Sequence, residues 1–219
     1  MDGWSALVLA GGAGRRFGGE GRAGKLLADL DGAPVIQRVV EGACHVPFVE
    51  VVVVTGADNA GVCAALAGQP CRIVHASDWA EGMAASLRAG IKAMAPGASG
   101  ACVFLGDMPL VPPSICPALA EAAERAGYAA RPRCEGKPGH PVAFARAAFA
   151  DLLALEGDRG ATGLLAGRAD LAYIDTADRG VLLDIDTPDD LRAAAWAWKA
   201  CATSATSDRA TSRGALPKP

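Results

Sequence analysis

The chain has 219 residues, of which 51% are hydrophobic and 21% charged, a balance that is typical of globular domains and excludes wholesale disorder. Its formal net charge of −3 excludes the strongly basic field that non-specific nucleic-acid binding requires. Glycine is in excess, because 27 of 219 residues are about 12%, against a usual share of about 7%. Since no collagen-like period is present, these glycines must serve turns or close backbone approaches.

The seven cysteines are scattered and include no C-x-x-C pair. They therefore predict reduced, mostly buried thiols of a cytosolic protein, not a disulfide framework or a zinc site. The sequence shows no signal-peptide pattern and no apolar run near the roughly 18–20 residues of a membrane-spanning helix. We expect a cytoplasmic protein whose partners are neither nucleic acids nor membranes.

Short apolar strands alternate with helices along the first half of the chain. The patterns predict strands at 5–10, 48–55, 72–75 and 101–105, with helices at 34–44, 59–67, 82–94 and 113–127. This alternation predicts an α/β domain with a mainly parallel sheet.

A polar segment dense in glycine and proline, residues 131–141, breaks this rhythm and is predicted as an irregular insert. Helices are then expected at 146–155 and 160–167, strands at 171–174 and 181–185, and a last helix at 188–200. The DTPDD sequence at 186–190 is a strong helix start. We expect one domain over residues 1–200, followed by a disordered tail at 201–219, which is rich in small and polar residues.

A glycine-rich loop follows the first predicted strand. It contains Gly11, Gly12, Gly14, Gly18, Gly19, Gly21 and Gly24, together with the cations Arg15, Arg16, Arg22 and Lys25. Glycines let backbone N–H groups surround an anion, and the cations neutralise phosphate charge. The loop therefore predicts a phosphate cradle at the carboxyl edge of the sheet. A flexible surface loop is the alternative.

Two better-known phosphate motifs fit this loop poorly. After the pair of glycines at 12 and 14, the third glycine of G-x-G-x-x-G is displaced, which disfavours a dinucleotide fold. The run GEGRAGKL at 19–26 almost matches a P-loop, but Leu26 offers no hydroxyl for Mg²⁺ and the run begins too far from the strand.

Asp107 comes directly after the strand predicted at 101–105, so its carboxylate is placed at the ligand edge of the sheet. A carboxylate there can hold Mg²⁺ against triphosphate oxygens, although a turn or helix-cap role is the alternative. Lys25 is expected to contact phosphates and to neutralise charge that develops at the α-phosphorus; a solvated surface role is its alternative.

Several segments together carry a resemblance to a known family. They are LAGGAGRRFG at 9–18 followed by Lys25, DWAEGMAASL at 78–87, GDMP at 106–109, GHPV at 139–142, GDRG at 157–160 and DIDTPDDL at 184–191. The set resembles the nucleotidyltransferases of the nucleotide-diphospho-sugar transferase superfamily over residues 4–198. Within it, the set looks most like the molybdopterin cytidylyltransferases of the MobA-like NTP transferase family. The resemblance implies a three-layer α/β/α Rossmann-like fold with a small insert on the acceptor side.

The resemblance also implies roles for individual residues. Catalytic roles fall on Lys25, Arg16 and Asp107, and metal ligation on Asp107 and Asp186, with Asp184 as an alternate. Nucleotide binding falls on Leu9, Ala10, Gly11, Gly12, Gly14, Lys25, Gly82, Ser86 and Asp107, and acceptor binding on His140, Asp158 and Arg159. Helix capping by Asp186 and loop or capping roles for the acceptor residues are the alternatives.

The activity that the resemblance implies is transfer of CMP from CTP to the phosphate of molybdopterin, with release of pyrophosphate and with Mg²⁺, or alternatively Mn²⁺, as cofactor. The loop reads LAGG where LAAG is expected, which leaves the choice between CTP and GTP open. Transfer to another phosphorylated acceptor is a further alternative. A non-catalytic chaperone that delivers molybdopterin to a molybdenum hydroxylase or its maturation factor is the alternative from another class.

Overall fold

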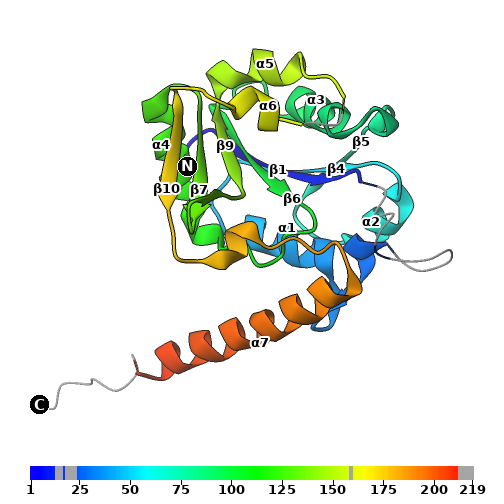
Figure 1. Cartoon of the computed structure of the whole chain (residues 1–219). Coiled ribbons are helices and arrows are strands. Elements are labelled where there is room, and N and C mark those ends of the chain that lie inside the picture. The colour runs from blue at the N-terminus through cyan, green and yellow to red at the C-terminus, as the bar shows by residue number, and fades with distance from the viewer. Residues whose placement is uncertain (13–16, 18–23, 158–159, 212–219) are drawn as a thin grey trace, which may run out of the picture.

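The computed structural model describes residues 1–12, 17, 24–157 and 160–211, with side chains up to residue 200. A central sheet has the strand order β10-β7-β9-β6-β1-β4-β5, and β8 pairs with β7 (Figure 1). The strands are β1 Trp4–Ala10, β4 Val51–Thr55, β5 Arg72–His75, β6 Gly100–Leu105, β7 Ala129–Cys134, β8 Lys137–Pro138, β9 Val142–Ala145 and β10 Leu171–Asp175. A separate hairpin joins β2 Asp29–Leu30 to β3 Ala33–Pro34.

The sheet is mostly parallel. β1 lies between β4 and β6 and is parallel to both, β5 is parallel to β4, and β10 is parallel to β7. β9 runs antiparallel to both of its neighbours, β6 and β7. Because β6 and β7 both run antiparallel to β9, they are parallel to each other. β7 and β10 therefore end at the same edge as β1, β4 and β6.

Helices cover both faces of the sheet, which confirms the predicted α/β architecture. The helices are α1 Val35–Cys44, α2 Asn59–Ala65, α3 Met83–Ala93, α4 Cys116–Ala126, α5 Phe149–Leu153, α6 Thr162–Leu165 and α7 Pro188–Thr211. Helices α1, α2 and α4 pack on one face and α3, α5 and α6 on the other. Every residue of β1 and β4 is buried, as expected for strands covered on both sides.

Short 3₁₀ turns complete the chain: η1 Lys25–Leu27, η2 Trp79–Glu81, η3 Pro113–Ile115, η4 Arg146–Ala148 and η5 Arg179–Leu182. The six cysteines whose side chains are described form no disulfide; Cys102, Cys116 and Cys134 are buried and the other three are half-buried. No helix in the described part of the chain combines the length and the apolar character needed to cross a membrane.

The prediction of an irregular loop over residues 131–141 is wrong. The segment forms most of β7 and the hairpin to β8, with Arg133 opposite Pro138 and Cys134 opposite Lys137. Glu135 and Gly136 turn the chain with φ of 51° and 75°, the left-handed geometry that suits a two-residue hairpin. Polar side chains misled the prediction, because Arg131 and Arg133 are only half-buried while the other residues of β7 are buried.

The strand predicted at 181–185 is also wrong. The chain there forms η5 and then an extended stretch in which the N–H of Ile185 donates to the carbonyl of Asp107 over 3.0 Å. Val181 and Ile185 are buried, so the apolar residues of this stretch pack in the interior although the stretch pairs with no strand of the sheet. The last helix was expected to end at 200, whereas α7 continues to Thr211 and runs outward from the domain (Figure 1). No glycine or proline interrupts the sequence between Pro188 and Thr211, which is compatible with a longer helix.

Candidate active site

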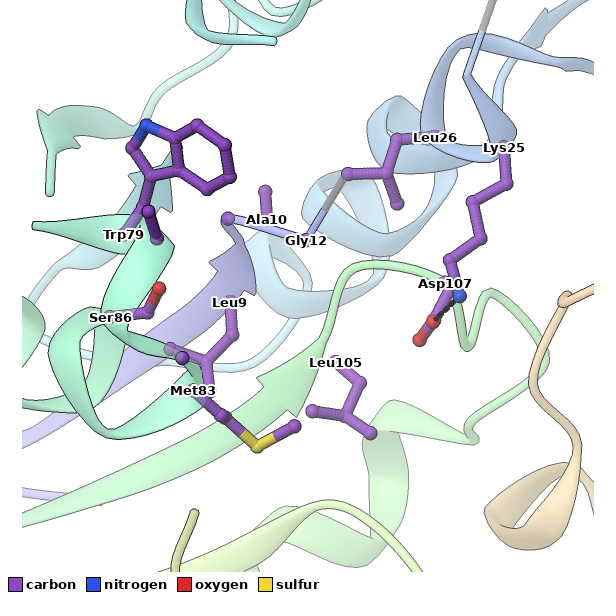
Figure 2. A pocket seen from close by; sticks show the side chains of 13 residues that line it. Leu9, Ala10, Gly12, Lys25, Leu26, Trp79, Met83, Ser86, Leu105 and Asp107 are labelled. Carbon is purple, nitrogen blue, oxygen red and sulfur yellow. Dashed lines mark ion pairs between the residues drawn. The ribbon is translucent and has the colours of Figure 1, made fainter. Parts of the chain in front are cut away.

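A cavity of ≈500 Å³ opens at the carboxyl edge of the sheet, where β1 and β6 end. Its wall is built from the ends of β1 and β6, η1, η2 and the first turn of α3 (Figure 2). The lining residues are Leu9, Ala10, Gly11, Gly12, Lys25, Leu26, Trp79, Ala80, Gly82, Met83, Ser86, Leu105 and Asp107. This edge of an open α/β sheet is the usual place for ligand binding.

Glycines allow close backbone approach on one side of this cavity. A Cβ on Gly11 would lie 2.5 Å from Ser86 Oγ, so no larger residue fits between β1 and α3 without displacement. Gly82 has φ of 112° and ψ of −171°, a conformation that glycine adopts at far lower cost than other residues. It places the start of α3, including Ser86, against the end of β1.

Lys25 connects two carboxylates on the opposite side of the cavity. Its Nζ lies 2.5 Å from Asp107 Oδ2 and 2.6 Å from Asp186 Oδ1. The side chains of Lys25 and Asp107 are only 15% and 18% exposed, so water screens this pair weakly. Figure 2 shows the Lys25 side chain extending from η1 towards Asp107, across the cavity from Trp79 and Ser86.

Asp186 reaches this cluster although it lies far along the chain from Lys25 and Asp107. The bond from Ile185 N–H to the Asp107 carbonyl holds the two segments side by side. The start of α7 is capped by a reciprocal pair, in which Asp190 Oδ2 accepts from the N–H of Thr187 over 2.7 Å and Thr187 Oγ1 accepts from the N–H of Asp190 over 3.2 Å. The capping role therefore belongs to Thr187 and Asp190, and the Asp186 carboxylate contacts Lys25.

The charges of this cluster perturb each other. Burial disfavours the ammonium of Lys25, but the negative charges of Asp107 and Asp186 outweigh it and raise the pKa of Lys25 above its usual value. Burial, and then the nearby carboxylates of Asp107 and Asp186, raise the pKa of Asp184. Lys25 is therefore fully charged near neutral pH, and added positive charge at this place would be favourable for the three carboxylates.

The same residues fit a divalent cation. Asp107 Oδ1 is buried and has no hydrogen-bond partner among the described residues, so this oxygen is available to a ligand. Two aspartate carboxylates are the hard oxygen donors that Mg²⁺ and Mn²⁺ prefer, with substrate phosphates completing the coordination. In the described ranges no group of three or more His, Cys, Asp or Glu residues has spacing that would hold a metal by itself.

The structure brings together most of the residues predicted for nucleotide binding. Leu9, Ala10, Gly11, Gly12, Lys25, Gly82, Ser86 and Asp107 all line the cavity, and Asp186 contacts Lys25. Gly14, Arg16, Asp158 and Arg159 lie outside the described residues.

His140 does not line the cavity. Its backbone N–H donates to the Val181 carbonyl over 2.8 Å, and its ring atom Nδ1 is buried with no partner in the described part of the chain. Burial, and then the charge of Arg131, lower the pKa of His140 to about 4. The imidazole is therefore neutral at physiological pH.

Apart from Leu9 and Ala10, sequence reasoning left the apolar wall out of the predicted site residues. Leu26, Trp79, Ala80, Met83 and Leu105 line the cavity. Trp79 and Met83 lie within the DWAEGMAASL segment, and Leu105 directly precedes Gly106. Their positions beside motif residues were the available signal, but apolar side chains carry no chemistry that separates a ligand wall from ordinary core.

The MobA-like NTP transferase domain matches residues 6–174 of this chain. The chain belongs to the MobA-like NTP transferase family. This match confirms the superfamily expected from the sequence motifs. NTP transfer is the activity of this family.

Solved structures agree with the family at the level of the whole domain. The Rv0371c homologue from Mycobacterium sp. strain JC1 is 28% identical, with a TM-score of 0.75 over 89% of this chain and 96% of that one. A nucleotidyl transferase from Methanothermobacter is 27% identical, with a TM-score of 0.74 over 85% and 93%. Rv0371c from Mycobacterium tuberculosis, 28% identical with a TM-score of 0.70 over 87% and 97%, was crystallised in complex with manganese.

A curated relative has a different stated activity. Nicotine blue oxidoreductase from Paenarthrobacter nicotinovorans is 39% identical over 90 residues, which cover 39% of this chain and 41% of that protein. This chain thus spans less than half of that relative in the match. The family model establishes that the chain belongs to the MobA-like family. The acceptor and the finer assignment as a molybdopterin cytidylyltransferase belong to the proposal below.

Proposed function

We propose that this MobA-like NTP transferase moves CMP from CTP to the phosphate of molybdopterin and releases pyrophosphate. The observation that carries the proposal is the position of Lys25, held between Asp107 and Asp186 at the edge of a cavity lined by Gly11 and Gly12. A cation, two carboxylates and exposed backbone N–H groups are the parts that bind and polarise a triphosphate.

The residues of the site divide the work between binding and charge neutralisation. The backbone of Gly11 and Gly12 offers N–H groups to phosphate oxygens, and the ammonium of Lys25 neutralises negative charge that develops during transfer. Asp107 and Asp186 would hold a divalent cation. Such a cation, when bound, supplies Lewis-acid stabilisation of phosphate oxygens. The manganese in a related structure supports this assignment.

The reaction needs no covalent intermediate on the protein. An acceptor phosphate oxygen attacks the α-phosphorus of the NTP in line, the bond to the bridging oxygen breaks, and the β- and γ-phosphates leave as pyrophosphate. Positioning and electrostatic stabilisation supply the rate enhancement. Trp79, Met83 and Leu105 form an apolar wall that would limit water access to the reacting phosphates.

A matrix of turnover assays tests the proposal. The protein is incubated with Mg²⁺, with molybdopterin or another phosphorylated acceptor, and with each NTP in turn, and pyrophosphate release is measured. The proposal expects acceptor-dependent release with CTP and molybdopterin. Equal or faster turnover with GTP would overturn the cytidylyl assignment, and molybdopterin binding without turnover of any NTP would favour a chaperone.

A redox activity is a second candidate, which the partial match with nicotine blue oxidoreductase favours. The same preparation incubated with nicotine blue and a reduced nicotinamide nucleotide tests it. Loss of colour that depends on the protein would support it, and no loss of colour together with pyrophosphate release would exclude it in favour of nucleotidyl transfer.

A further inference from the structure

A second polar region lies on β7 and β10, on the same face of the sheet as the cavity, and β9 separates it from the cavity strand β6. Arg131 of β7 is in register with Tyr173 of β10. Two residues before each of them, Ala129 and Leu171 pack in the core cluster that also contains the cavity residues Leu9 and Leu105. Because side chains two residues apart on a strand share a face, Arg131 and Tyr173 lie on the same face of the sheet as the cavity. They are nearer to the carboxyl edge than Ala129 and Leu171.

Arg131 carries a charge that no carboxylate in the described ranges balances. Its Nε and Nη2 both donate to the carbonyl of Gly139, over 3.1 and 3.0 Å. Arg133, two residues along the same strand, instead forms a two-bond ion pair with Asp175 at 2.7 and 3.0 Å. Burial lowers the pKa of Arg131 from its usual value, which reports the cost of keeping this cation partly out of water.

The guanidinium is oriented by these two bonds. They use the edge formed by Nε and Nη2, so the edge formed by Nη1 and Nη2 makes no hydrogen bond within the described residues. A planar guanidinium edge matches two oxygens of one phosphate or carboxylate group. The Gly139 carbonyl therefore orients the Nη1 and Nη2 donors of Arg131, and no acceptor for this pair lies among the described residues.

His140, the residue after Gly139, has one ring atom without a partner among the described residues. The charge of Arg131 acts on its ring, and its buried Nδ1 has no hydrogen-bond partner in the described part of the chain. A buried polar atom without a partner is unusual in a folded protein and points to a missing ligand or water. The imidazole already has a hydrogen bond with the backbone of Val103, so the binding of an anion depends on the charge and the free donor edge of Arg131.

We propose that Arg131, with His140 beside it, binds an oxyanion of the acceptor substrate, of the phosphate or carboxylate class. The inference deepens the proposed function and rests on it for the identity of the ligand as an acceptor. The positive charge of Arg131 and its free donor edge do not depend on the proposed function. An acceptor held here would lie against β7 and β10, on the same face of the sheet as the nucleotide cavity.

The test observes the arginine itself. In protein labelled with ¹⁵N, the Nε–Hε signal of Arg131 is assigned as the one lost in Arg131→Lys, and it is followed while inorganic phosphate, glycerol phosphate or acetate is added in the presence of excess CTP. The proposal expects this signal to shift and the signal of Arg133 to stay in place. A shift with phosphates alone, or also with acetate, defines which oxyanion the site accepts.

Two matched variants complete the test. Arg131→Gln should weaken oxyanion binding by roughly tenfold to a hundredfold, whereas Arg133→Gln should leave it unchanged. Arg131→Lys should fall between them, because it keeps the charge but loses the paired donors. An unshifted Arg131 signal, or equal weakening by Arg131→Gln and Arg133→Gln, would overturn the proposal.

CTP affinity, measured on the same samples, separates this inference from the proposed function. Arg131→Gln should leave CTP affinity unchanged. Failure of the wild-type protein to bind CTP would count against the proposed function, while the Arg131 signal would still report on the oxyanion site. Thermal unfolding of each variant checks that the fold is intact, because a variant that unfolds early would be replaced by Arg131→Lys in the comparison.

Discussion

Asp107→Asn is the most informative single change at the cavity, because it removes a charge while keeping the shape of the side chain. The carboxylate loses its ion pair with Lys25, in which Nζ and Oδ2 lie 2.5 Å apart. Lys25 keeps its contact with Asp186 at 2.6 Å. The buried Oδ1, which has no hydrogen-bond partner among the described residues, is available to a cation.

The expected effects on folding and on activity differ in size. One hydrogen bond between charged groups contributes about 1.5–3 kcal/mol, and since Lys25 retains Asp186, the free energy of unfolding should fall by no more than about that amount. Turnover depends on stabilising charge in the transition state, where loss of one group costs about 10²–10³-fold. Activity should therefore collapse while the protein stays folded.

The assay combines pyrophosphate release with urea unfolding. Asp170→Asn is the matched control, because Asp170 also forms an ion pair, with Arg168 at 2.8 Å, but lies just before β10 at the amino edge of the sheet. It should change turnover little. Wild-type turnover of Asp107→Asn with saturating Mg²⁺ would refute the assignment of Asp107, and an equal loss in Asp170→Asn would show that the effect is general destabilisation.

Three further predictions follow from local geometry. Gly11→Ala should weaken NTP binding by about tenfold, since its Cβ would lie 2.5 Å from Ser86 Oγ, and a double-mutant cycle with Ser86→Ala should recover part of the loss; additive losses would contradict this contact. The pKa of His140, about 4 when folded, lies below the unfolded value near 6.5, so the unfolded chain binds the extra proton between these values and stability falls as the pH decreases. This should cost roughly 3 kcal/mol by the time the pH is below the folded value, and urea unfolding of His140→Gln should lack that component; an unchanged pH dependence would contradict it. Gly90→Ala places a Cβ against the side chain of Leu7 in β1, closer than van der Waals contact allows, and should destabilise the protein by about 1–3 kcal/mol. Gly163→Ala, with open space in α6, should not; similar denaturation midpoints would contradict the packing argument.

The regular part of the fold could be predicted because its strands are buried on both faces. The runs that became β1, β4 and β6 are almost wholly apolar, and their positions locate the carboxyl edge where Lys25 and Asp107 meet. Burial of both faces makes such strands visible as apolar runs.

The acceptor side was mispredicted for the opposite reason. β7 is only half-buried on one face near its end, where it carries Arg131 and Arg133 in place of the valines of a core strand, and its hairpin uses glycine and proline. In the stretch 181–185 the apolar residues satisfy packing, and the backbone bonds to Asp107 without joining the sheet. Side-chain polarity alone cannot separate an uncovered strand from a loop.

The candidate site was only partly visible for a third reason. The charged members occur in recognisable motifs, but the meeting of Asp186 with Lys25 depends on a backbone bond between Ile185 and Asp107. Contacts of this kind join segments far apart in sequence, and no local pattern encodes them. The unbalanced charge of Arg131 likewise becomes visible only when the positions of all described carboxylates are known.

The central claim is that the protein transfers a nucleotidyl group, and labelled CTP tests it most directly. With ³²P at the α-phosphate, the label should appear in a product that contains the acceptor, and with ³²P at the γ-phosphate it should appear in pyrophosphate. Transfer of the γ-label to the acceptor, or α-label found only in free CMP or CDP, would contradict the account.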